Sequence, residues 1–276
     1  MKKQHRVIMV SLCTALVLML GGCAPKAPMI GTVPSADQVA IQYETVGRGD
    51  TALVFVHCWT CNRSEWDKQA EYFSGKYQVV RLDLAGHGGS GRERKDYTIE
   101  AFAADVTTVV DQLGLKRAVL IGSSMGGPVA VEAAGRLGNR AIGVVGVDSF
   151  YTGFEVPKDP KKFEAMKRGF LKPFEENYPV AAANFIRGFF APGAEPKLVE
   201  RIASGTAATD KTMALSAMRN IFAWHHRNTP ATLDALGPRL RNINANPKSD
   251  RQPLHASVVL VAGRRAFHPG GKTGRV

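Results

Sequence analysis

The sequence predicts an α/β fold: a mostly parallel central sheet flanked by helices, with a helical cap inserted between two strands. The first observation is that short runs of strand character alternate with longer helical segments over residues 38–150 and resume within 237–276. The second is that residues 151–236 show helical spacing, broken by Pro and Gly, without a strand pattern. With 276 residues, 45% of them hydrophobic, the chain can bury a large core.

Each predicted element follows from its own pattern. Residues 39–47 alternate between apolar and polar as an edge strand does, whereas 51–58 form the continuous apolar run of a buried parallel strand. Residues 98–115 repeat apolar side chains at the spacing of an amphipathic helix. The other predicted strands are 77–86, 117–123, 141–150, 240–246 and 256–263, and the other helices outside the cap are 64–76 and 125–138. This order favours right-handed crossovers, which leave helices on both faces of the sheet.

The N-terminus has the features of an export signal. Residues 1–22 combine a basic start with an apolar run that is short for a membrane span. The stretch LGGC, Leu20–Cys23, resembles the lipobox of bacterial lipoproteins. The resemblance implies an exported protein that is acylated at Cys23 and held at a membrane; Ala24 implies the outer membrane, facing the periplasm. The alternative is an ordinary signal peptide with a chance cysteine.

Two further features concern the ends of the chain. Residues 23–37 are polar and broken by proline, so we expect them to form a tether. The formal net charge is +12, and the segment 237–276 carries eight Lys or Arg residues against one acid. A basic segment can indicate nucleic acid or anionic lipid. Because aromatic residues do not interleave with it and no nucleic-acid motif occurs, we expect no nucleic-acid partner.

The four cysteines suggest different roles. Cys13 lies within the export signal and Cys23 is the expected acylation site. Cys58 and Cys61 form a C-x-x-C pair, which could be a disulfide, a redox pair or half of a zinc site. Because no second C-x-x-C occurs in the chain, we predict no metal site.

The stretch GSSMG, residues 122–126, is a G-x-S-x-G motif between the strand 117–123 and the helix 125–138. A nucleophilic serine requires this context, because the sharp turn lifts its oxygen above the edge of the sheet. Side chains at the flanking positions would collide with the neighbouring strand and helix. The motif therefore predicts Ser124 as a nucleophile, with the Met125 N–H at a helix N-terminus able to hold a developing oxyanion.

Three further stretches carry a family resemblance. With GSSMG, the stretches FVHCWT (55–60) and LDLAGHGGSG (82–91) resemble the α/β-hydrolase fold superfamily, and CNRSEWDKQ (61–69) looks like its esterase-type members. The resemblance implies that the Trp59 N–H completes the oxyanion hole with Met125, and that His87 is structural. Cys58 stands where the family usually has glycine.

The same resemblance implies an acid and a histidine after the serine. Asp148 follows one strand and Asp250 follows the next, and either could be the acid. His268 is the histidine that follows the last predicted strand, but it comes after a phenylalanine, whereas the family has Gly-x-Gly-His-Phe. Codons permitted for residues 264–268, read one nucleotide later, can spell Val-Gly-His-Phe, so a frameshifted C-terminus is an open hypothesis.

The sequence thus leaves two functions open. The leading one is a membrane-tethered serine hydrolase that cleaves an ester or related acyl bond of a small molecule through an acyl-enzyme on Ser124, without a cofactor. The helices of 151–236 would then form a lid over the substrate. The alternative is an inactive hydrolase scaffold or binding protein, whose C-terminus lacks the histidine.

Overall fold

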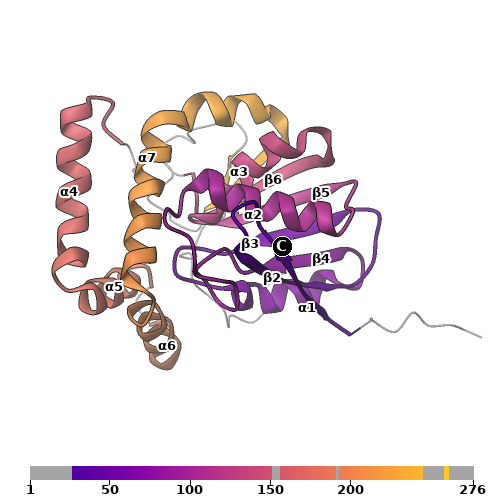
Figure 1. Cartoon of the computed structure of the whole chain (residues 1–276), viewed down its shortest axis with the longest axis horizontal. Helices are drawn as coiled ribbons and strands as arrows, with labels where there is room; N and C mark the ends of the chain where they lie inside the picture. The colour runs from indigo at the N-terminus through magenta and orange to yellow at the C-terminus, as the bar shows by residue number, and fades with distance from the viewer. Residues whose placement is uncertain (1–26, 151–155, 191–192, 245–257, 261–276) are drawn as a thin grey trace, which may run out of the picture.

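The computed structural model describes residues 27–150, 156–190, 193–244 and 258–260, and an eight-stranded sheet forms its centre (Figure 1). In spatial order the strands are β1 (Met29–Pro34), β2 (Ala40–Val46), β4 (Gln78–Leu82), β3 (Ala52–Val56), β5 (Ala118–Ser123), β6 (Ala141–Val147), β7 (Leu240–Asn244) and β8 (Val258–Leu260). β2 is antiparallel to both β1 and β4, and all other neighbours are parallel. The predicted mostly parallel α/β sheet is confirmed.

Helices cover both faces of the sheet. α2 (Ile99–Gln112) and α3 (Gly126–Leu137) pack on one face, and the short helix η1 (Arg63–Trp66) with α1 (Asp67–Phe73) packs on the other. Two further short helices, η2 (Gly138–Arg140) and η3 (Gly237–Arg239), lead into β6 and β7. Because side chains alternate along a strand, β3 serves both layers: Val54 and Val56 join the α2–α3 side, and Phe55 joins the α1 side.

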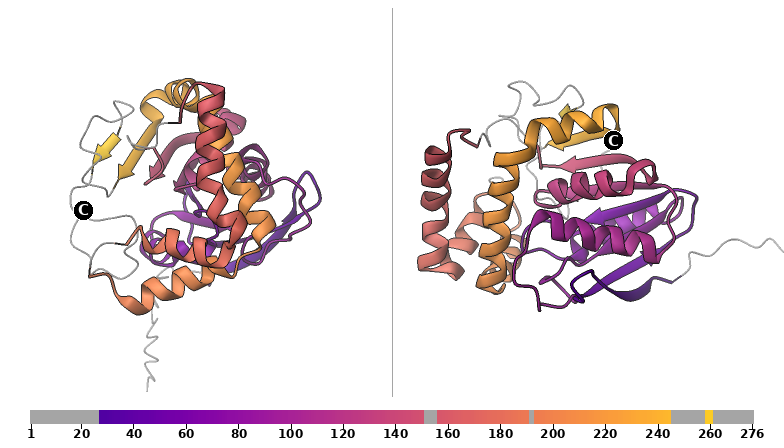
Figure 2. Two further views of the ribbon diagram at one scale, coloured as in Figure 1. Left: turned by 90° about the vertical axis from the view of Figure 1, so that its left-hand side faces the viewer. Right: turned by 45° about the horizontal axis from the view of Figure 1, so that its top comes forward.

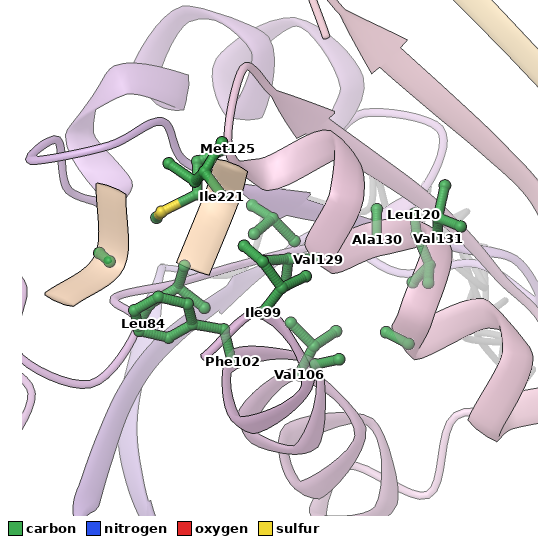
Figure 3. Packing of buried hydrophobic residues seen from close by; sticks show 14 of the residues in the cluster. Leu84, Ile99, Phe102, Val106, Leu120, Met125, Val129, Ala130, Val131 and Ile221 are labelled. Carbon is green, nitrogen blue, oxygen red and sulfur yellow. The ribbon is translucent and has the colours of Figure 1, made fainter. Parts of the chain in front are cut away.

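The larger core lies between α2, α3 and the sheet. Ile99, Phe102 and Val106 lie about one turn apart on α2; Ile99 lies beside Val129 of α3, and the Phe102 ring lies beside Leu84 (Figure 3). Their side chains are fully buried, which is the packing expected of the amphipathic stripe in the sequence. α2 begins where Thr98 caps it, its hydroxyl accepting the Ala101 N–H at 3.0 Å. This core holds β5 and α3 rigidly at the turn that contains Ser124.

Four helices form the predicted cap between β6 and β7. They are α4 (Pro160–Glu176), α5 (Tyr178–Arg187), α6 (Pro196–Ala207) and α7 (Lys211–Leu236). The cap gathers on one side of the sheet, and α7 runs from it back over the core (Figure 1, Figure 2). Asp159 and Asp210 cap α4 and α7 by accepting backbone N–H groups. In the described part of the chain, no helix is both long and apolar enough to cross a membrane.

The structure corrects the prediction for residues 23–37. Part of the expected tether, Met29–Pro34, is strand β1, so β2 is not the edge strand that the alternation suggested. This strand is stable here because β2 supplies backbone partners along its length, and Pro34 sits at the strand end, where its missing N–H matters least. Asp37 then anchors the following turn through an ion pair with Arg94 at 2.7 Å.

Candidate active site

Ser124 occupies a strained turn at the carboxyl end of β5. Its φ is +49°, a left-handed conformation that a residue with a side chain rarely adopts. The Ser124 N–H donates to Val147 O at 2.9 Å, and its carbonyl accepts from the Gly127 N–H at 3.0 Å. These bonds bind the turn to β6 and to the start of α3, so the strain is held by the surrounding structure. The Ser124 residue is exposed, as a nucleophile must be.

The residues that flank the turn must be glycines, because a side chain has no room there. A Cβ at Gly122 would lie 1.9 Å from Gly126 O, and a Cβ at Gly126 would lie 2.4 Å from Val56 O. Both contacts are with backbone, which cannot move aside. The predicted reason for the two glycines of G-x-S-x-G is therefore confirmed: β5, the turn and β3 approach each other too closely for side chains.

The two predicted oxyanion donors lie in buried residues beside this turn. Met125 precedes the first residue of α3, and Trp59 lies in the loop that follows β3. Among the described residues, neither backbone N–H donates to a protein acceptor. Buried N–H groups are rarely left unpaired, so two such groups at the carboxyl ends of the paired strands β3 and β5 are suited to hold an anionic oxygen.

The Trp59 side chain joins the core to the cap. Its indole Nε1 donates to Ala214 O of α7 at 2.9 Å, across 155 residues of chain. Its ring meets Phe174 of α4 and Phe185 of α5 edge-on, both with centroids 5.9 Å away. The position of the Trp59 backbone is therefore coupled to the cap, and aromatic side chains surround this part of the candidate site.

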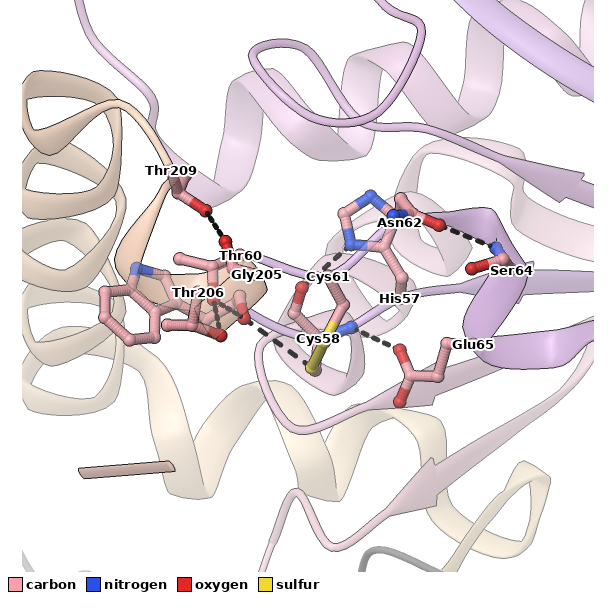
Figure 4. Close-up of a disulfide and its surroundings, with 11 residues drawn as sticks. His57, Cys58, Thr60, Cys61, Asn62, Ser64, Glu65, Gly205, Thr206 and Thr209 are labelled. Carbon is pink, nitrogen blue, oxygen red and sulfur yellow. Dashed lines mark hydrogen bonds between the residues drawn. A yellow bond between two sulfur atoms is a disulfide. The ribbon is translucent and has the colours of Figure 1, made fainter. Parts of the chain in front are cut away.

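The loop that carries Trp59 also contains a disulfide, and a carboxylate of the following helix η1 lies beside it (Figure 4). Cys58 and Cys61 are disulfide-bonded, which is one of the alternatives left open by the sequence. The Cys58 N–H donates to Glu65 Oε2 at 2.8 Å. Burial raises the pKa of the Glu65 carboxyl to about 7, although the Cys58 N–H and the Ser123 side chain both bond to it and act in the opposite direction.

The sequence analysis gave no role to Glu65, although this residue lies within the stretch 61–69 that resembles esterase-type members. It contacts both the loop after β3 and the residue before Ser124, so it connects the two parts of the candidate oxyanion hole. The donor atoms of Cys58, Cys61 and Glu65 lie within 4.8 Å of one another, the distance range of a metal site. Since the thiolate is the metal-binding form of cysteine, the disulfide does not act as a ligand pair.

The two histidines near the loop are structural. Leu84 N–H donates to His57 Nε2 at 3.0 Å, so His57 Nδ1 carries the proton and donates to Cys58 O at 2.8 Å. Burial lowers the pKa of His57 to about 4 and that of His87 to about 3, so both rings are neutral near pH 7. His87 is enclosed beside His57, with ring centroids 4.8 Å apart, in keeping with the structural role that the family resemblance implied.

The candidate acids and base are described only in part. Asp148 is half-buried at the end of β6, immediately after Val147, which pairs with Ser123 in the sheet. Asp148 therefore follows β6, the neighbour of the strand that leads to Ser124, and both residues lie at the carboxyl ends of their strands. Asp250 and His268, the frameshift hypothesis for 264–268 and the acylation site Cys23 lie outside the described residues, and these remain predictions.

The chain is similar to known proteins over much of its length. Residues 51–257 match a family model described as alpha/beta hydrolase fold. The chain is 38% identical to 3-oxoadipate enol-lactonase 2 of Acinetobacter baylyi over 94 residues, 34% of this chain and 35% of that protein. It is 30% identical to the bifunctional esterase/perhydrolase DCH of Acinetobacter calcoaceticus over 175 residues, 60% of this chain and 63% of that protein. It thus spans less than two thirds of the length of each relative.

Solved structures share the fold. The esterase EaEST from Exiguobacterium antarcticum aligns with a TM-score of 0.68 at 18% identity, over 85% of this chain and 90% of that chain. The enol-lactonase from Burkholderia xenovorans LB400 aligns with a TM-score of 0.65 at 22% identity, over 86% of this chain and 92% of that chain. Since the family model covers most of the chain and the sheet and serine turn have the corresponding arrangement, this protein belongs to the alpha/beta hydrolase fold family.

Proposed function

We propose that this protein is a serine hydrolase that cleaves a carboxylic ester or a related acyl bond of a small molecule. One observation carries the proposal. The exposed Ser124, at φ +49°, is followed directly by Met125, and Trp59 lies in the loop after β3, the strand that pairs with β5. Both residues are buried, and neither backbone N–H has an acceptor among the described residues. A nucleophile at the end of one strand and unpaired N–H donors at the ends of that strand and its neighbour are the parts that acyl transfer requires.

The reaction proceeds in two halves. Ser124 Oγ attacks the carbonyl carbon and a base takes its proton, while the carbonyl oxygen becomes an oxyanion that accepts hydrogen bonds from Met125 N–H and Trp59 N–H. The intermediate then collapses, the alcohol leaves with the proton, and an acyl group remains on Ser124. Water attacks this acyl-enzyme in the second half and releases the acid. We assign the base to His268 and the orienting acid to Asp148 or Asp250.

The cap supports an apolar substrate. Phe174 and Phe185 pack against the Trp59 ring from two cap helices, so the side chains that hold this residue are aromatic. The names of two relatives, an enol-lactonase and an esterase/perhydrolase, also concern acyl bonds. We therefore expect esters and lactones with an apolar acyl part to be better substrates than charged ones.

A fluorophosphonate probe followed by peptide mapping tests the function. We expect labelling of Ser124, and loss of labelling in Ser124→Ala. Ser123→Ala is the matched control, since it removes the neighbouring hydroxyl and should keep the label on Ser124. Hydrolysis of p-nitrophenyl esters of increasing acyl length then measures the substrate range. An unlabelled Ser124 together with no ester hydrolysis would favour the inactive scaffold or binding protein.

We also propose that the enzyme is lipid-anchored to a bacterial outer membrane through Cys23. The support is the LGGC stretch at Leu20–Cys23, directly after the apolar run of the export signal. Metabolic labelling with a radioactive fatty acid, compared between the wild type and Cys23→Ser, tests it. We expect label and membrane fractionation in the wild type alone; a labelled Cys23→Ser chain would contradict the assignment.

A further inference from the structure

The loop between β3 and η1, together with η1 itself, carries a group of three reactive side chains that ester hydrolysis does not use. Cys58 and Cys61 are joined by a disulfide, with Cα atoms 5.2 Å apart. The Glu65 carboxylate completes the group, since its oxygen and the two sulfurs all lie within 4.8 Å of one another (Figure 4). A half-buried carboxylate beside a disulfide loses part of its hydration, so its chemistry requires an explanation.

We propose that Cys58, Cys61 and Glu65 form a dithiol–disulfide site that exchanges with external dithiols, and that its redox state sets the rate at which Ser124 reacts. The first half of this proposal stands on the geometry of the loop alone. The second half rests on the proposed hydrolase function.

The two cysteine residues differ in their exposure to solvent. The Cys58 residue is only 4% exposed, whereas Cys61 is half-buried. An external dithiol therefore attacks the Cys61 sulfur with one thiolate. A bond forms between the reductant and Cys61, the bond to Cys58 breaks, and Cys58 leaves as a thiolate. The second thiolate of the reductant attacks its own sulfur in this mixed disulfide and releases Cys61. The protein disulfide gains two electrons and two protons, and the dithiol becomes a disulfide.

Glu65 is placed to supply the proton that Cys58 needs. Its carboxylate binds the Cys58 N–H at 2.8 Å and lies beside the Cys58 sulfur. Burial raises the pKa of Glu65 to about 7, so at neutral pH a large fraction of this carboxyl carries a proton. A protonated carboxyl can give its proton to the leaving thiolate, and a deprotonated one can take it back when the disulfide re-forms.

The disulfide encloses the candidate oxyanion donor. The residues between the two cysteines are Trp59 and Thr60, and Thr60 has a φ of +61°. This is a strained conformation for a β-branched residue, and it persists only where the surroundings impose it. Reduction opens the ring and removes one of those restraints. We therefore expect the Trp59 amide to lose its position, and the oxyanion hole to weaken, in the dithiol form.

One tryptic peptide makes the redox state measurable in the full-length chain. Cleavage after Arg48 and Arg63 yields the peptide 49–63, which contains Cys58 and Cys61 and neither of the other two cysteines. The detergent-purified protein is equilibrated in defined mixtures of reduced and oxidised dithiothreitol, and free thiols are alkylated before digestion. Each sample is also assayed with p-nitrophenyl acetate, and circular dichroism checks that the fold persists.

We expect the peptide to change from no label to two labels in one two-electron transition. Over the same range of dithiothreitol mixtures, we expect the rate of ester hydrolysis to fall at least about 10-fold, which is the effect of losing part of one oxyanion donor. Cys61→Ser should be insensitive to the dithiol. Glu65→Gln, which keeps a hydrogen-bond acceptor but has no proton to give, should slow reduction at pH 7. Two labels without any reductant, or equal hydrolysis in both states, would overturn the proposal.

The Ser124→Ala variant separates the two proposals. Its peptide should titrate like that of the wild type, because the disulfide chemistry does not involve Ser124. If the peptide titrates but the wild type hydrolyses no ester in either state, the proposed function fails while the exchange site stands. If esters are hydrolysed but the peptide does not titrate, the exchange site fails and the hydrolase stands.

Discussion

Ser124 and Asp148 have the same unusual backbone conformation at the ends of two neighbouring strands, with φ values of +49° and +47°. The Ser124 N–H donates to Val147 O at 2.9 Å, and the Asp148 N–H donates to Ile243 O at 2.8 Å. Each residue thus leaves its strand while its N–H stays bound to the next strand across the sheet. Strained residues of this kind concentrate at functional sites, and these two both follow the carboxyl ends of parallel strands.

This relationship favours Asp148 as the acid. We expect Asp148→Asn to lower kcat/KM for a p-nitrophenyl ester by about 10²–10⁴-fold, because the base would lose the carboxylate that orients it. Asp250→Asn is the comparison, and we expect it to stay within a few-fold of the wild type. Steady-state kinetics of both variants measure the difference; the reverse ranking would assign the acid to Asp250.

The second prediction concerns the turn around Ser124. Gly126→Ala would place a Cβ 2.4 Å from Val56 O, and we expect it to lower the free energy of unfolding by about 2–4 kcal/mol. Gly135→Ala is the matched control in the same helix, because a Cβ there meets nothing within 4 Å. It should raise stability by about 0.5–1 kcal/mol. Urea unfolding of the two variants measures both changes, and equal effects would contradict the packing argument.

The third prediction concerns the connection between Trp59 and the cap. Trp59→Phe removes the indole N–H that donates to Ala214 O, and we expect a loss of about 1 kcal/mol in stability with a several-fold lower kcat. Trp66→Phe is the control, because the buried Trp66 Nε1 has no hydrogen-bond partner in the described part of the chain. Thermal unfolding and ester kinetics should show lower stability and lower kcat only for Trp59→Phe. Similar losses of stability and kcat in both variants would mean that the volume of the ring matters and the hydrogen bond does not.

The fourth prediction is the pH dependence produced by Glu65, whose pKa rises from 4.5 to about 7 on folding. A carboxyl with a raised pKa binds its proton more tightly in the folded state, so its contribution to stability falls as pH rises from about 4.5 to about 7. Glu65→Gln removes this dependence. We expect its stability relative to the wild type to increase by about 1–3 kcal/mol between pH 5 and pH 8. Urea unfolding at both pH values, with the disulfide intact, measures the increase; a constant difference would exclude Glu65 as the titrating group.

Local patterns in the sequence determined much of this protein. The apolar period separates strands from helices at almost every element, because periods of 2 and 3.6 residues are set by backbone geometry. The glycines of GSSMG predict the tight turn at Ser124, since a steric requirement at one turn is visible in the residues of that turn. The break in strand pattern after residue 150 predicts the cap for the same reason, because helical spacing is a property of the segment itself.

Tertiary structure alone decided the rest. Met29–Pro34 has no strand pattern of its own and becomes β1 because β2 supplies its hydrogen bonds. Glu65 becomes part of the site through Cys58 and Ser123, the second of which is 58 residues away in the chain, and its raised pKa arises from burial that no local pattern encodes. The link from Trp59 to Ala214 spans 155 residues. Such contacts depend on which surfaces meet in the folded chain, so they follow from the arrangement of the elements and not from the residues of any one segment.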